Sequence, residues 1–322
     1  MKQVYSFSIA EIGILLDIPF ELKISKEFSP FAVTCQSYDT RVCFHKVSQL
    51  DVNLADRICE IDLFSICHDD KGFYRAYHRP CQYDNIYAIG RFLDDYTEEV
   101  LYREQDEILL TTARCCFMHT SFERHMLNCG AMVLHASLIQ TELGGLLFTG
   151  PSGIGKSTQA DLWNKLRNAD ILNGDRAVLR KIGTKWKAYG SPYAGSSRVF
   201  VNRGSEITAI VILQKSEENH IELVNPVMAF QKLYSQMLMN TWDREYVNRI
   251  ADYIEELIQE VPVYLLACRP DEGAVEILER SLKRSSWRII FMQRQTNRKF
   301  LCLAHLSYHL CVILIVRCVI SK

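Results

Sequence analysis

The sequence predicts an α+β fold in which a glycine-rich loop is inserted into a mixed β core, preceded by a β-rich region. Three observations predict this class. Short β-favouring runs fill residues 1–110, strand and helix patterns alternate over 111–283, and a glycine loop at 150–157 follows an apolar strand and opens a helix. A tail at 284–322, first basic and then apolar, completes the expected organisation.

Length and composition indicate an ordinary globular protein. The 322 residues are 48% hydrophobic and 23% charged, which is enough apolar material for one large domain or two ordinary ones. The formal net charge of −1 gives no reason to expect nucleic-acid binding. The 12 cysteines form no CxxC pair, and the N-terminus soon acquires Glu11 and Asp17, unlike a signal peptide. Reduced thiols in a cytoplasmic protein are therefore expected.

The first 110 residues carry the strand signals. Tyr5, Phe7 and Ile9 alternate with smaller or polar neighbours, and Arg41–Phe44 is a short β-favouring run. The aromatic and basic segment Gly72–Arg79 is followed by a proline, and we expect it to be a half-exposed strand.

The next segments lead into and out of the glycine loop. Thr112–Asn128 has a helical pattern that ends before a glycine, and Met132–Ile139 is a buried-strand candidate. After the turn at Gly144-Gly145, Leu146–Thr149 is expected to be the second arm of a hairpin that runs directly into the loop. An amphipathic helix is expected from Lys156 to Arg167.

The remaining pattern alternates strands and helices. The expected strands are 171–172, 177–182, 185–189, 207–213 and 262–267. The run 207–213 is continuously apolar, which is typical of a central strand covered on both faces. Helical spacing follows Pro226 as far as Leu238, Asp243 is placed to cap a second helix, and a short acidic helix begins at Asp271.

The loop itself matches the P-loop (Walker A) pattern GxxxxGK[ST]. Glycines let the backbone curl so that several N–H groups point at phosphate oxygens, and the following helix adds the positive end of its dipole. Lys156 is placed to reach the β- and γ-phosphates, and the Ser157 hydroxyl to complete a Mg²⁺ shell. The sequence therefore predicts ATP with Mg²⁺ as the ligand, with GTP left open. The expected nucleotide-binding residues are Gly150, Pro151, Ser152, Gly153, Ile154, Gly155, Lys156, Ser157 and Thr158.

A metal-holding acid is expected at the end of a neighbouring strand. Asp175 follows the first strand after the loop helix, so Ser157 and Asp175 are the predicted metal ligands. Arg176 is placed either to pair with Asp175 or to contact a phosphate. Arg198 follows a loop of small residues, and it is either a charge-neutralising group beside the phosphates or a solvated arginine on an ordinary turn.

The run from Leu134 through the Ser-Gly-Ile-Gly-Lys-Ser loop resembles the catalytic domain of HPr serine kinase, whose nucleotide-binding fold is shared with phosphoenolpyruvate carboxykinase. The resemblance covers about 130–270. It implies a loop inserted in a mainly β core rather than in a Rossmann-type sheet. It also implies that His135 faces the phosphates from the adjacent strand, although a histidine there is also typical of a hydrogen-bonded core residue. The loop pattern, its neighbourhood and this resemblance together make Asp175, Lys156, His135 and Arg198 the candidate catalytic residues.

One departure from that family bears on the function. HPr kinases end the strand in two consecutive acids, whereas this chain has Gly174 before Asp175. Either Asp175 does both jobs, or the base lies elsewhere, or phosphoryl transfer to a serine is not the reaction. The resemblance implies an ATP-dependent kinase acting on a serine or other hydroxyl of a small protein, peptide or metabolite. The alternative is a non-catalytic, ATP-dependent binding module for a partner peptide or protein.

The partners follow less directly from the sequence. The β-rich N-terminal region is the expected docking place for the acceptor, and nothing in the sequence excludes a homo-oligomer. The apolar run Leu301–Ile320 is interrupted by His305, His309 and Arg317, so it is a poor candidate for a membrane-spanning helix. A packed or partner-bound helix and a tail without an evolved role are the other interpretations.

Overall fold

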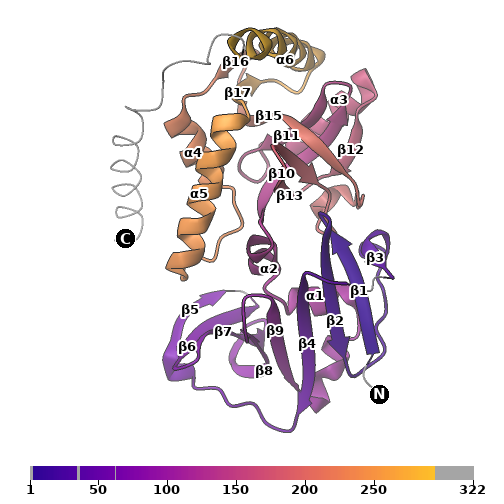
Figure 1. Cartoon of the computed structure of the whole chain (residues 1–322), viewed down its shortest axis with the longest axis vertical. Coiled ribbons are helices and arrows are strands. Elements are labelled where there is room, and N and C mark those ends of the chain that lie inside the picture. Colours follow the sequence, from indigo (N-terminus) through magenta and orange to yellow (C-terminus); the bar gives the residue numbers. More distant parts are fainter. Residues whose placement is uncertain (1–2, 35–36, 62, 294–322) are drawn as a thin grey trace. The chain divides into compact units, whose positions relative to one another are not determined.

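The computed structural model describes residues 3–34, 37–61 and 63–293. The chain divides into two compact units, Met1–Leu278 and Glu279–Lys322. The first unit contains two large mixed β-sheets accompanied by helices (Figure 1). The predicted α+β class, with a mixed β core that carries the loop, is confirmed.

The first sheet is built from the N-terminal third of the chain. Its nine strands lie in the order β3-β1-β2-β4-β9-β8-β7-β6-β5. They are β1 (Gln3–Ile9), β2 (Ile12–Ile18), β3 (Ala32–Val33), β4 (Thr40–Val47), β5 (Arg57–Ile61), β6 (Phe64–Asp69), β7 (Gly72–Arg79), β8 (Gln82–Phe92) and β9 (Thr97–Arg103). Most neighbours are antiparallel, whereas β4 runs parallel to both β2 and β9. The predicted β-rich N-terminal region is confirmed.

Strand β7 corrects one expectation. Gly72–Arg79 is a strand as predicted, but it is largely buried rather than half-exposed. It lies inside the sheet between β6 and β8, and both of its faces are covered. Tyr77 packs into one hydrophobic cluster, while Tyr74 and Ala76 pack into another. Alternating side chains therefore enter two different cores, which a strand covered on one face does not do.

The helix expected over 112–128 is two helices, α1 (Ala113–Met118) and α2 (Phe122–Asn128). Thr112 begins α1, because its hydroxyl accepts a hydrogen bond from the Cys115 N–H at 3.1 Å. The break falls at Ser121, whose backbone N–H donates to the carboxylate of Glu98 on β9. In a continuous helix the Ser121 N–H would donate to a backbone carbonyl of the preceding turn, but here it donates to the Glu98 carboxylate instead.

The second sheet carries the loop. Its strands are β10 (Ala131–Thr141), β11 (Gly144–Thr149), β12 (Asp170–Asn173), β13 (Arg176–Ile182), β14 (Lys185–Tyr189), β15 (Gly204–Lys215), β16 (His220–Leu223) and β17 (Val263–Cys268). The predicted hairpin is confirmed as β10 and β11. The pairings run β11-β10-β13-β14-β15 and then return from β15 to β11, so these five strands close a ring. The apolar run 207–213 is the buried centre of β15, as predicted.

Four helices accompany this sheet in the chain. They are α3 (Lys156–Arg167), α4 (Pro226–Tyr234), α5 (Arg244–Glu260) and α6 (Glu272–Gln293). Two of them differ from expectation: α6 is longer than the short acidic helix predicted, and α4 ends before Leu238. After α4 the backbone pairs with β10 instead, since the Leu238 N–H donates to Val133 and the His135 N–H donates to Gln236. Short 3₁₀ helices occupy Ser29–Phe31, Leu54–Asp56, Glu104–Leu109 and Gly195–Ser197.

One hydrophobic core joins the two sheets. Phe7 on β1 makes edge-to-face contacts with Phe28 and Phe117, with ring centroids 6.1 and 5.1 Å apart. Val178 and Tyr189 of the second sheet belong to the same buried cluster. Aromatic side chains bury large apolar areas, so this shared core holds the N-terminal sheet against the sheet that carries the loop.

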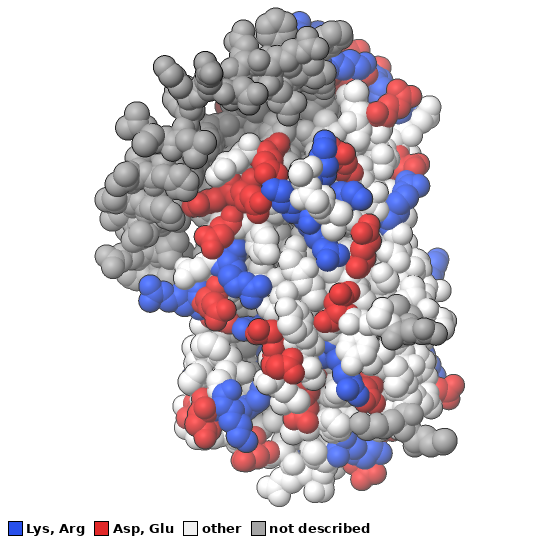
Figure 2. Space-filling view, viewed as in Figure 1, with Lys and Arg blue, Asp and Glu red and all other residues white. Residues whose placement is uncertain are grey.

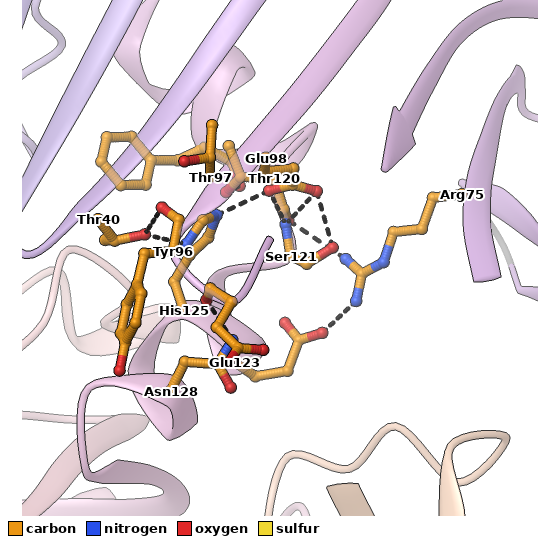
Figure 3. Close-up of polar contacts among 12 residues, drawn as sticks. Thr40, Arg75, Tyr96, Thr97, Glu98, Thr120, Ser121, Glu123, His125 and Asn128 are labelled. Carbon is orange, nitrogen blue, oxygen red and sulfur yellow. Dashed lines mark hydrogen bonds and ion pairs between the residues drawn. The ribbon is translucent and has the colours of Figure 1, made fainter. Parts of the chain in front are cut away.

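A buried polar network ties α2 to the first sheet (Figure 3). Glu98 is fully buried, and its carboxylate accepts hydrogen bonds from Ser121 and from the His125 ring at 2.8 Å. The other ring nitrogen of His125 bonds to the hydroxyl of Thr40 on β4. Burial by itself raises the pKa of Glu98, but the bonds from His125 and Ser121 and the charge of Arg75 bring it below its ordinary value.

The described cysteines are all free thiols. Among the helices that the structure describes, none is both long enough and apolar enough to cross a membrane. The apolar run Leu301–Ile320, for which three interpretations remain, lies outside the described residues.

A second buried contact of α2 leads to a stability prediction. Arg75 on β7 forms an ion pair with Glu123, and each side chain is only 9% exposed. Glu123→Ala should lower the free energy of unfolding by about 3–5 kcal/mol, because it leaves a buried guanidinium without its counter-charge. Urea denaturation measures the change. Glu206→Ala is the matched control, since it removes an exposed ion pair of the kind that contributes about 0–1 kcal/mol. Equal small effects in the two variants would contradict this role for Arg75–Glu123.

Candidate functional site

The glycine loop connects the end of β11 to the start of α3, as the sequence predicts. Gly150, Gly153 and Gly155 have φ values of 144°, 75° and 114°. Side chains strongly disfavour these backbone conformations, so the spacing of the glycines follows from the curl of the loop. The loop thus has the local conformation that the GxxxxGK[ST] pattern requires.

Backbone donors are left unpaired where the loop enters α3. The N–H groups of Gly153, Gly155, Lys156 and Ser157 have no hydrogen-bond acceptor within the described part of the chain. The N-cap residue, Gly155, has no side chain with which to supply one. Unpaired donors at the positive end of a 12-residue helix are the kind of group that can bind the oxygens of an anion.

Lys156 lies across the loop rather than in solvent. Its Nζ donates to the carbonyls of Gly150 at 3.0 Å and Pro151 at 3.3 Å. Burial lowers the pKa of Lys156, and the charge of Asp175 opposes that shift. The ammonium is therefore held at the start of the glycine loop, where it adds positive charge.

Asp175 is held by a residue whose role sequence reasoning missed. The side chain of Asn173, which is fully buried at the end of β12, accepts hydrogen bonds from the backbone N–H groups of Asp175 and Arg176 at 2.9 and 2.8 Å. Its amide donates to the carbonyls of Ser191 and Tyr193. An Asn two residues before an acid in a turn is a recognisable signal for this bonding.

His135 and Asp175 form a pair across β10 and the β12–β13 turn. The His135 Nε2 lies 3.3 Å from Asp175 Oδ1, and Arg176 Nε lies 3.7 Å from the other carboxylate oxygen. The hydrogen bond from His135 is the main cause that lowers the pKa of Asp175, and the charges of Arg176 and Lys156 act in the same direction. The structure thus brings together three of the four candidate catalytic residues.

The fourth candidate, Arg198, lies in the loop after β14. It is exposed, has a left-handed φ of 53°, and lines the same cavity as Asp175 and Arg176. Arg203 differs, because it forms a surface ion pair with Asp170 at 2.6 Å. Of these two arginines, Arg198 is therefore the one that shares a cavity wall with Asp175.

The space around Gly174 accounts for the absence of a second acid. A Cβ at position 174 would lie 2.1 Å from the Ser197 Oγ and 2.4 Å from the Ser197 Cβ. Gly174 does not have a left-handed φ, so it is space rather than backbone conformation that excludes a side chain there. The site has one carboxylate at this turn because the loop that carries Ser197 fills the place of another.

Ser157 and Asp175 are the residues that could hold a metal ion. Within residues 3–34, 37–61 and 63–293, no group of three His, Cys, Asp or Glu side chains is arranged to hold a metal ion. The Ser157 hydroxyl and the Asp175 carboxylate are oxygen ligands, and Mg²⁺ bound with a nucleotide commonly takes one or two protein ligands besides phosphates and water. The donor set fits Mg²⁺ accompanied by a triphosphate.

Known proteins resemble this chain in structure but not in sequence. No family model matches the sequence, and no curated protein matches it. Among solved structures, the Hpr(Ser) kinase/phosphatase from Coxiella burnetii is similar over 52% of this chain and 99% of its own, with 14% identity and a TM-score of 0.31. At that degree of likeness, a function has to be argued from the site of this chain itself.

The crowding between position 174 and Ser197 predicts that a second substitution at Ser197 restores the stability lost by one at Gly174. Gly174→Ala should lower the free energy of unfolding by about 1–3 kcal/mol, because its methyl group would overlap Ser197. Ser197→Gly combined with Gly174→Ala should recover most of that loss in urea denaturation. Additive losses in the double variant would show that Ser197 is not the obstacle.

The His135–Asp175 contact predicts a titration shift. His135→Asn should raise the pKa of Asp175 toward its ordinary value, as measured by ¹³C NMR of the carboxyl group. A depressed carboxylate pKa contributes stability above the unfolded pKa of about 3.9, and this contribution is lost as the pH falls through the folded pKa. The variant should therefore lose part of that contribution at neutral pH. His220→Asn, at an exposed position on β16, is the control, and an Asp175 pKa that is the same in both variants would refute the assignment.

Proposed function

We propose that this chain is an ATP- and Mg²⁺-dependent phosphotransferase that transfers the γ-phosphoryl group to a hydroxyl of a small protein, peptide or metabolite. One observation supports the proposal: unpaired backbone N–H groups lie at the start of α3, next in the chain to Lys156, whose ammonium is within electrostatic reach of Asp175. Such an arrangement suits a polyphosphate with a metal-binding acid beside it.

Each residue has a role in this proposal. The loop N–H groups and Lys156 bind the β- and γ-phosphates and hold them in line with the acceptor. Ser157 and Asp175 would hold Mg²⁺, which neutralises phosphate charge when it is bound. Arg198 is exposed and lines the cavity, and it stabilises the negative charge that develops on the transferred phosphoryl group.

The proposed transfer moves one phosphoryl group and one proton. The acceptor oxygen bonds to the γ-phosphorus, the bond from that phosphorus to the β–γ bridging oxygen breaks, and ADP leaves. The hydroxyl proton passes to the Asp175–His135 pair, which the 3.3 Å contact already joins. A single acid with a histidine partner then takes the place of the two consecutive acids of the resembling kinases.

A second candidate function is a nucleotide-dependent binding module without catalysis. The observation in its favour is the filled space at Gly174, which leaves one carboxylate where the resembling kinases have two. In that case ATP would order the loop without transfer of its phosphoryl group.

Lys156 variants separate the two candidates. Lys156→Ala should reduce phosphoryl transfer from γ-labelled ATP to cell-extract acceptors by about 10²–10³-fold, because it removes a charge aimed at the transferred group. Asp175→Asn should weaken ATP binding in the presence of Mg²⁺ more than in its absence, since it removes a metal ligand. Lys165→Ala, an exposed lysine on the same helix, should behave as the wild type.

Two results decide against the kinase. If ATP binds but no Lys156-dependent transfer or hydrolysis occurs, the binding module is favoured. If ATP does not bind at all, both candidates fail.

A further inference from the structure

A large cavity adjoins the proposed transfer site. It has a volume of about 970 Å³ and lies within the unit Met1–Leu278. Asp175 and Arg176 form part of its wall, while Phe64 and Arg75 line it from the first sheet. This volume lies at the upper end of the range for small-molecule pockets. Asp175 therefore stands between the nucleotide loop and a space that another molecule can occupy.

One corner of the cavity is aromatic. The rings of Phe64 and Trp242 pack edge to face with centroids 6.4 Å apart. The guanidinium of Arg75 lies over the Phe64 ring at 4.5 Å and is buried in its ion pair with Glu123. This corner is thus apolar, because the nearest charge, that of Arg75, is neutralised by Glu123. It therefore suits an apolar part of a ligand.

The charges on the cavity wall favour an anion. Cationic residues outnumber acidic ones on the wall, five to three: Lys26, Arg75, Arg114, Arg176 and Arg198 against Glu27, Glu123 and Asp175. Each acid faces an arginine, and Lys26 and Arg198 have no ion-pair partner among the described residues. The unpaired charges on this wall are therefore positive.

Three arginines lie around one partly buried ring. Tyr193 is within electrostatic reach of Arg176, Arg75 and Arg114, and the Arg176 guanidinium lies 5.4 Å from the centre of its ring. On the face shown in Figure 2, by contrast, acidic and basic side chains are interspersed. The cationic excess thus distinguishes the cavity from that face.

We infer that the acceptor is a small molecule that carries a hydroxyl, an anionic group and an apolar part, and that it binds in this cavity with its hydroxyl toward Asp175. The inference rests on the proposed function. A folded protein partner presents a face of about 800 Å² to its target, which does not suit a recess of this kind, whereas a small molecule fills it.

The probe is 3-phenyllactate, which combines a hydroxyl, a carboxylate and an aromatic ring. Its binding to the full-length protein without nucleotide is measured by isothermal titration calorimetry, with 3-phenylpropane-1,2-diol as the uncharged comparison. We expect saturable binding of phenyllactate and at least tenfold weaker binding of the diol.

Charge variants test whether the cavity is the place of binding. Lys26→Gln combined with Arg198→Gln should weaken phenyllactate binding at least tenfold, because it removes the two unpaired cations. Lys185→Gln, at an exposed lysine of β14 outside the cavity, should bind phenyllactate as the wild type does. Urea midpoints equal to the wild type confirm that the variants are folded.

Several outcomes overturn the inference: no saturable binding of phenyllactate below about 10 mM, equal binding of the diol, or unchanged binding in the double variant. Label transfer to an extract protein that phenyllactate does not inhibit also overturns it, in favour of a protein acceptor. Phenyllactate binding without any ATP binding would defeat the phosphotransferase and leave the cavity as an anion site. The two failures are therefore distinguishable.

Discussion

The hydrogen bonds of the buried Asn173 side chain are the contact on which the candidate site depends. They hold the turn that carries Asp175 and Arg176 on one side, and the backbone of Ser191 and Tyr193 on the other. Asp175 and Arg176 line the cavity, as does Tyr193, and Asp175 is also within electrostatic reach of Lys156. One buried amide therefore holds both segments of the candidate site in place, and the loss of these partners would leave several polar groups unsatisfied.

The N-terminal sheet takes part in the site through α2. Glu98 and His125 anchor the helix to β9 and β4, and Glu123 on the same helix neutralises Arg75 at the cavity wall. Buried charges of this kind persist only with partners, so the position of α2 and the charge of the wall are coupled. The β-rich region thus forms part of the cavity wall, through residues such as Phe64 and Arg75.

Much of the fold and the centre of the site could be predicted from local sequence. The loop glycines, the β10–β11 hairpin, the buried centre of β15 and the approach of Asp175 to Lys156 all follow from spacing and periodicity. Two of the differences from expectation depend on residues far away in the chain: Glu98 breaks the helix at Ser121, and β10 pairs with the backbone after α4. The space at Gly174 is likewise filled by a distant residue, Ser197. No window of local sequence contains these pairs.

The closed ring of β10, β11, β13, β14 and β15 limits which parts of this chain can move or vary. Since β11 is hydrogen-bonded on both sides, to β10 and to β15, it has no free edge along which to slip in register. The start of the glycine loop is therefore rigidly placed, whereas the loop between β14 and β15 contains irregular backbone and an exposed arginine. Divergent copies of this chain could therefore vary that one loop, which lines the cavity, while β11 and the start of the glycine loop stayed as they are.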